Sequence, residues 1–90
     1  MVVRKELGKL IWGLQLGAKY EMPVSKQVPS VGLGVEELRI KDATGAYRVF
    51  YLTRQGDRIL IFHAFKKKTQ QTPKKEIATG QKRLKEILNE

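Results

Sequence analysis

The 90-residue sequence contains no cysteine and only one histidine, His63. Without cysteine the chain can form no disulfide, no thiolate metal site and no cysteine nucleophile. One histidine alone also leaves too few ligands for a zinc site. We therefore expect no metal and no cofactor, small-molecule cofactors included.

Long apolar runs are also missing, and no stretch approaches the ~20 residues of a membrane-spanning helix. The first 18 residues carry an early basic pair and end in small residues, as a signal peptide does. However, Glu6, Lys9 and Gln15 interrupt the apolar segment that a signal peptide needs. The sequence thus predicts a cytoplasmic protein with no membrane partner, and the absence of disulfides agrees with a reducing compartment.

Acidic residues are scarce: nine Asp and Glu stand against eighteen Lys and Arg, which gives a net charge of +9. Such an excess favours a polyanionic partner, namely nucleic acid, an anionic membrane surface or an acidic protein. A basic surface that only serves solubility is the alternative. The length and a hydrophobic content of 41% predict a single domain over residues 1–90 with one modest core.

A helix is predicted near each end of the chain. Apolar residues over 2–16 recur at a spacing of three and four, typical of an amphipathic helix, and Gly17 is placed to end it. Near the other end, Thr72 and Pro73 fit the cap and the first position of a second helix.

The residues between the helices predict a loop and then three antiparallel strands. Residues 18–34 are rich in proline and glycine and lack periodicity, which is typical of a loop. Alternating, aromatic and β-branched residues separated by turn sequences predict strands over 36–41, 46–53 and 58–65. The fold class is therefore α+β, an antiparallel β-meander with the N-terminal and C-terminal helices packed on the sheet.

Loop lengths decide which strand residues share a face, because side chains alternate along a strand. If residues 42–45 form a four-residue turn, Arg39 lies opposite Arg48; a two-residue turn keeps both on one face. If the second turn is also even, with its centre at residues 56 and 57, His63 lies opposite Phe50. An odd turn would place His63 among the core residues instead.

With even turns the two faces of the sheet differ in character. One face holds a set of polar side chains: Arg39, Arg48, His63 and Lys67. The other holds the predicted core: Leu38, Ile40, Tyr47, Val49, Tyr51, Leu60 and Phe62. Like charges directly opposite each other are unfavourable, so the paired arginines predict a bound anion or an intervening carboxylate such as Glu37.

Each of these polar residues also has a purely structural interpretation. A lone histidine is often a structural residue, a lysine run can be a solvated guard of a strand edge, and the arginines could form surface salt bridges. A functional interpretation is favoured because these groups occur together on one face. Guanidinium groups suit phosphate, and imidazole and ammonium groups can move protons or bind anions.

Two stretches, ELRIKDATGAYRVFY (37–51) and ILIFHAFKKKTQQTPKKEI (59–77), resemble a known family. They are similar to the RelE/HigB-type toxins of bacterial type II toxin–antitoxin modules, especially the phage-derived HigB-like branch. The resemblance covers about 31–88, and KELGKLIWGLQLG (5–17) is similar to that family's second helix. Relatives begin with a further strand and helix, so we expect the family's first strand and first helix to be absent here.

The resemblance implies a RelE-like fold with helices on one side of a twisted antiparallel sheet. It implies an endoribonuclease that cleaves mRNA in the ribosomal A site and inhibits translation. A cognate antitoxin, often with a helix-turn-helix domain, would neutralise it.

The resemblance also assigns roles to single residues. Arg48 and Arg39 match the arginines that engage the scissile phosphate, and RNA contacts are expected from Lys41, Lys66, Lys67 and Lys68. Where relatives end the last strand in His or Tyr, this chain has lysines. The residue that transfers protons is therefore left open among Lys67, Lys68 and His63. Glu37 is a candidate base or orients the arginines.

Two alternatives belong to other functional classes. One is a non-enzymatic protein of the same fold, either a ParE-like gyrase inhibitor or a truncated relic that only binds an antitoxin. The other is a basic RNA-binding module that stacks bases on its aromatic rings: Tyr47, Phe50, Tyr51 and Phe65.

Overall fold

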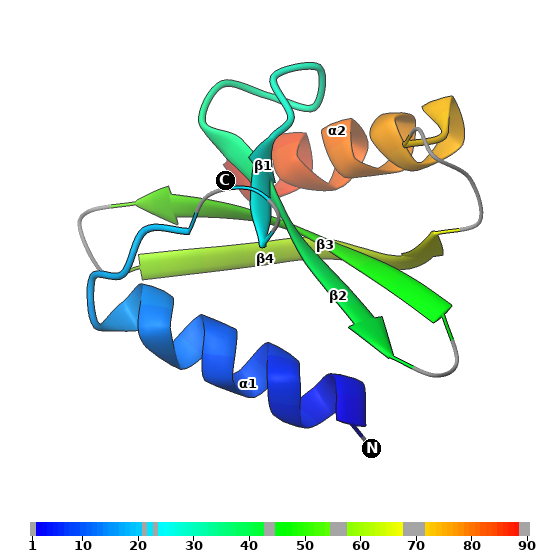
Figure 1. The fold of residues 1–90 in the computed structure, drawn as a ribbon. Coiled ribbons are helices and arrows are strands. Elements are labelled where there is room, and N and C mark those ends of the chain that lie inside the picture. Colours follow the sequence, from blue (N-terminus) through cyan, green and yellow to red (C-terminus); the bar gives the residue numbers. More distant parts are fainter. Residues whose placement is uncertain are drawn as a thin grey trace.

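A computed structural model of the chain describes residues 2–20, 22, 24–42, 45–54, 58–67 and 72–88. Its elements, in chain order, are α1 (Val2–Gln15), β1 (Ser25–Gln27), β2 (Val35–Asp42), β3 (Gly45–Arg54), β4 (Arg58–Lys67) and α2 (Lys74–Leu88). The strands form one antiparallel sheet in the order β1-β2-β3-β4 (Figure 1). The predicted α+β meander with a helix near each end is confirmed.

Strand β1 lies within residues 18–34, so the prediction of a loop throughout that segment was wrong. The strand has only three residues, too few for an alternating pattern to be visible in the sequence. Pairing with β2 creates it: Arg39 donates its backbone N–H to Val24 at 2.8 Å, and Val28 donates to Val35 at 2.9 Å.

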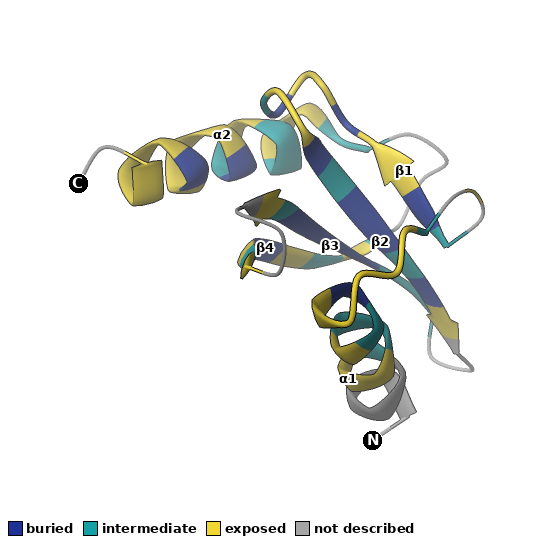
Figure 2. Cartoon of the chain, turned by 90° about the vertical axis from the view of Figure 1, so that its left-hand side faces the viewer, coloured by how far each residue is buried: buried dark blue, intermediate teal, exposed yellow. Residues whose placement is uncertain are grey.

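The two helices cover opposite faces of the sheet (Figures 1 and 2). On the α1 face, Leu14 packs with buried residues of β2 and β3: Leu38, Val49 and Tyr51. On the α2 face, Leu84 packs with a second set: Val28, Val31, Val35, Phe50 and Phe62. The arrangement differs from the one-sided packing that the family resemblance implied. The cause lies in β3, where three consecutive apolar residues, 49–51, make both faces apolar and in need of cover.

A β-bulge in β4 sets the register on which the site depends. Arg54 pairs with Arg58, so three residues join β3 to β4 and the connection is odd, the case expected to place His63 among the core residues. The register then shifts between Tyr51, which pairs with Ile61, and Phe50, which pairs with His63. The bulge thereby restores the predicted pairing of His63 with Phe50 and keeps His63 out of the α1-side core.

Both helix boundaries lie close to their predicted positions. Gly17 follows α1 with a positive φ of 96°, a conformation that glycine adopts at low cost and that ends helices. Helix α2 begins one residue later than predicted, and the Pro73 carbonyl accepts from the backbone N–H groups of Glu76 and Ile77. The hydroxyl of Thr72 points elsewhere, to Glu37.

Candidate functional site

The strand pairing gathers basic side chains on the α2 face of the sheet. Arg39 lies directly opposite Arg48, as the four-residue turn predicted. Lys41 and Lys67 both pair with Ala46, from opposite sides, and so lie in one row on the same face. Strand β1 adds Lys26, which pairs with Glu37.

Part of this basic set borders a groove of about 330 Å³ between β1, β2, the end of β4 and the start of α2. Three cations line it, namely Lys26, Arg39 and Lys67, together with one carboxylate, Glu37. The rest of the lining comes from the last residue of β1 and the segment after it, and from α2 and the residues just before it: Gln27, Val28, Pro29, Ser30, Thr72 and Ile77. An open groove with three cations and one anion has the charge balance of a site for a negatively charged ligand.

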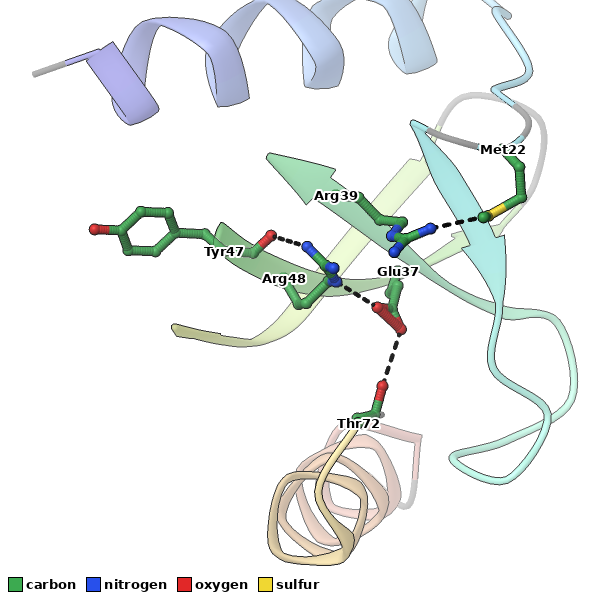
Figure 3. Close-up of polar contacts among 6 residues, drawn as sticks. All are labelled: Met22, Glu37, Arg39, Tyr47, Arg48 and Thr72. Atoms are coloured by element: carbon green, nitrogen blue, oxygen red, sulfur yellow. Dashed lines mark hydrogen bonds and ion pairs between the residues drawn. The ribbon is translucent and has the colours of Figure 1, made fainter. Parts of the chain in front are cut away.

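Arg48 stands behind this groove in a buried ion pair with Glu37 (Figure 3). Its Nε lies 2.9 Å from Glu37 Oε1, and the two side chains are 6% and 5% exposed. The N–H direction does not complete a hydrogen bond to that oxygen, and no other described residue accepts from this buried nitrogen. Arg48 Nη1 donates to the Tyr47 carbonyl at 3.1 Å. Thr72 donates to the second carboxylate oxygen of Glu37 at 3.3 Å.

Burial and neighbouring cations lower the pKa of two basic residues of the site, Arg48 and Lys67. Burial and then the charge of Arg39 lower the pKa of Arg48, although the Glu37 carboxylate opposes the shift. Partial burial, followed by Arg48 and Arg39, lowers the pKa of Lys67, again against the effect of Glu37. The protein thus holds positive charges together at an electrostatic cost that a bound anion would relieve.

His63 lies beneath α2 and is not among the residues that line the groove. Its Nε2 is 2.7 Å from Glu76 Oε1, and Arg83 Nη1 is 2.9 Å from its Nδ1. Because a guanidinium only donates, Nδ1 must accept and Nε2–H must donate to Glu76, which assigns a neutral tautomer. The ring also stacks on Phe65 at 5.4 Å and tilts against Phe50 at 5.6 Å. Both nitrogens are therefore engaged in holding α2, and the catalytic role of His63 stays a prediction.

The other predicted site residues lie in several places. Lys66 projects to the opposite face from Lys67, with its Nζ 6.0 Å from the centre of the Tyr47 ring. Lys41 is exposed at the end of β2, and Lys68 lies outside the described residues. Arg39 Nη1 donates to the sulfur of Met22 at 3.2 Å (Figure 3).

Two residues of the site were missed from the sequence. The sequence predicts a loop at Lys26, because no pattern reveals the short strand β1 that pairs it with Glu37. The sequence predicts only a capping role for Thr72, because a threonine before a proline is the one local signal at that position. Its distance from Glu37 is a property of the tertiary fold.

A protein-family model described as "Phage derived protein Gp49-like (DUF891)" matches residues 2–85. The chain belongs to this family. Membership agrees with the phage-derived branch that the sequence resembles, and it is consistent with a toxin-like protein. No curated protein and no solved structure matches the chain.

Neither helix of this Gp49-like protein, over the part of the chain that the structure describes, is long and apolar enough to cross a membrane.

Proposed function

We propose that this Gp49-like protein is the cytoplasmic toxin of a type II toxin–antitoxin module and cleaves mRNA on the ribosome as an endoribonuclease. The observation that carries the proposal is the groove in which Lys26, Arg39 and Lys67 surround Glu37, with Arg48 directly behind it. Family membership supports a toxin-like protein, and the groove supports a phosphate-bearing substrate.

Holding the phosphate falls to the cations. Arg39 and Lys67 line the groove and can reach a phosphate there, and the planar fork of Arg39 suits two of its oxygens. Negative charge grows on these oxygens when the phosphorus becomes five-coordinate. Cations fixed in advance around that position stabilise the transition state more than the ground state.

Proton transfer completes the reaction. Glu37 accepts the proton of the 2′-OH, and the 2′-oxygen bonds to phosphorus. The bond to the 5′-oxygen breaks, and this oxygen takes a proton from the Lys67 ammonium, which leaves a 2′,3′-cyclic phosphate and a free 5′-hydroxyl. The lowered pKa of Lys67 makes its ammonium a stronger acid than an ordinary lysine.

Arg48, which sequence resemblance puts first among the phosphate ligands, has a second role here as the partner of Glu37. Only 5% of the residue is exposed, so it is no ordinary surface arginine. Removing one member of a buried ion pair leaves the other unpaired, at a cost of about 3–5 kcal/mol. The variant Arg48→Ala should therefore lose stability as well as cleavage, and it cannot test the site alone.

The decisive variant is Arg39→Ala, which removes a groove cation that has no buried partner. Ribosome-dependent mRNA cleavage should fall about 10²–10³-fold, as for loss of one preorganised donor, with the melting temperature unchanged. Arg39→Lys should restore only part of the rate. Arg58→Ala, an exposed arginine at the other end of the sheet, is the matched control. A folded Arg39→Ala protein that cleaves at the wild-type rate would show that the groove is not the active site.

For Arg48, the double variant Glu37→Gln with Arg48→Met removes both charges of the buried pair together. It should keep more stability than Arg48→Ala alone while still failing to cleave. Thermal unfolding beside the cleavage assay separates the two roles of Arg48. Full cleavage by the double variant would exclude both residues from the chemistry.

The alternatives predict other outcomes in the same experiments. A gyrase inhibitor of this fold would arrest growth without shortening transcripts. The RNA-binding module loses support from burial, because two of its four proposed stacking rings, Phe50 and Tyr51, are 0% and 1% exposed. Neither ring can stack on a base without unfolding the sheet.

A further inference from the structure

Helix α2 carries its four lysines on one flank. Lys74, Lys75, Lys82 and Lys85 are all exposed. At 3.6 residues per turn they fall within a sector of about 100° around the helix. Of the two glutamates of α2, Glu76 faces His63 on the far side and Glu86 lies just beyond the outer edge of the sector. Figure 2 shows this helix with its inner face buried and its outer surface exposed.

That lysine flank begins where the groove ends. Ile77 lines the groove from α2. Gln81, about one turn further along the helix, donates to the carbonyl of Ser30 at 2.6 Å, and Ser30 lines the groove as well. In angular order around the helix axis, the positions beyond Gln81 on the side away from Ile77 include the four lysines: Lys74, Lys85, Lys82 and Lys75. Positive charge therefore continues from the groove onto the flank of α2 without an intervening acidic residue.

We propose that the lysine flank is a track for the RNA backbone on one side of the cleaved phosphate. This inference rests on the proposed function, since it extends the same RNA out of the groove. From Lys74 to Lys85 the helix rises about 16 Å, long enough to follow several nucleotides. Flexible ammonium groups suit this task, because they attract phosphates as point charges and read no sequence.

The track contributes binding and no chemistry. Its loss should weaken the affinity for long RNA and the salt dependence of that affinity, while an RNA short enough to fit the groove should bind as before. In the cleavage reaction, KM should rise with kcat unchanged, because the interaction is equally strong in the ground state and the transition state.

The probes are 2′-O-methyl RNA strands, which lack the nucleophilic hydroxyl and are not cleaved. A trinucleotide and a strand of about 15 nucleotides, within the range of known single-strand sites, are compared. The variants are Lys82→Gln/Lys85→Gln and the fourfold Lys→Gln change of the whole flank. The matched control is Lys9→Gln/Lys19→Gln, two exposed lysines on the α1 side. Glutamine is nearly as good a helix former as lysine, so α2 should persist, and circular dichroism checks this.

For the longer strand, log K falls with log salt, and the steepness of that fall should decrease by about 0.7 for each lost contact, so by close to 3 for the fourfold variant. The trinucleotide affinity and the control pair should stay unchanged. Wild-type affinity of the fourfold variant for the longer strand overturns the track, as does an equal loss with the trinucleotide. If the fourfold variant keeps its RNA affinity and instead loses binding to vesicles of acidic phospholipid, the flank is a membrane contact and the proposal is wrong. Wild-type protein that binds neither strand contradicts the proposed function itself.

Discussion

At the scale of single residues, Lys67 has the environment best suited to report on the chemistry. It lies at the end of β4, in the row of Lys41, and lines the groove with Arg39 and Glu37. Partial burial and the neighbouring guanidinium groups lower its pKa. The same shift acts on stability and on catalysis with opposite signs, so that the two effects can be separated.

The stability effect follows from proton binding. Between the lowered pKa of the folded state and the ordinary value, the unfolded chain binds more protons at Lys67 than the folded chain does. The free energy of unfolding should therefore rise with pH across that window. Cleavage should fall across the same window, because the protonated ammonium is the acid. Denaturant unfolding and cleavage, each measured against pH, give the two curves.

Two variants test the assignment. Lys67→Arg keeps the positive charge but is a poor acid, so the rate should drop about 10²–10⁴-fold and lose its alkaline fall. Lys66→Arg, on the opposite face of the same strand, should keep both wild-type curves. An alkaline fall that survives in Lys67→Arg assigns the titrating group to another residue.

Part of this site could be predicted from single residues and part could not. Alternation along the strands was sufficient to bring Arg39 and Arg48 onto one face, because that depends only on an even first turn and a local period. Lys67 shares that face because the bulge in β4 compensates for the odd connection between β3 and β4. The opposed arginines predicted an intervening carboxylate such as Glu37, but no pattern in the sequence showed that Arg48 would be buried against it or that His63 would be held by α2. The contacts of His63 depend on where α2, from the far end of the chain, packs against the sheet.

At the scale of elements, the long strands were predictable because ten or so residues carry a visible pattern. Strand β1 was not predictable, because its three residues owe their conformation to the pairing partner. The bulge in β4 shows a further limit: an odd connection and one extra residue compensate each other, so His63 lies on the face expected for an even turn although the connection is odd. Local periodicity predicts which residues form strands far better than it predicts irregularities within them.

A glycine in α2 shows how closely that element fits the sheet. A Cβ at Gly80 would lie 2.8 Å and 2.9 Å from two ring carbons of Phe50, which is fully buried. Gly80→Ala should therefore lower the free energy of unfolding of the protein. Overpacking costs about 1–3 kcal/mol, and the better helix propensity of alanine offsets up to ~1 kcal/mol of that cost. Gly8→Ala in α1 is the matched control: a Cβ there meets nothing within 4 Å, and the helix should gain stability. Urea unfolding measures both, and a stabilised Gly80→Ala protein would contradict the packing of α2 on Phe50.

At the scale of the whole molecule, the sheet separates two kinds of surface. The α2 face holds the groove and the lysine flank, where positive charge dominates. On the other side α1 covers an apolar core but leaves Trp12 and Leu16 largely exposed. A chain of +9 that concentrates charge on one face is well suited to polyanions, and for the same reason it needs control of where it binds.

That charge predicts the character of the cognate antitoxin, which we propose to be a helix-turn-helix protein with an acidic toxin-binding segment. Opposite charges steer the two chains together, so their association rate constant should fall steeply as salt rises, while the dissociation rate changes little. Co-expression with the product of the neighbouring reading frame and co-purification would establish the pair, and stopped-flow mixing at increasing salt would give the rates. An uncharged osmolyte at matched viscosity separates charge screening from slower diffusion.

The stability of this chain gives a second test of the antitoxin. At a partner concentration about 100-fold above Kd, the complex should add about 2.7 kcal/mol to the stability of this chain. A chain that is expressed alone without toxicity and gains no stability from the neighbouring product would contradict the toxin–antitoxin proposal while leaving the RNA groove to be judged by its own variants.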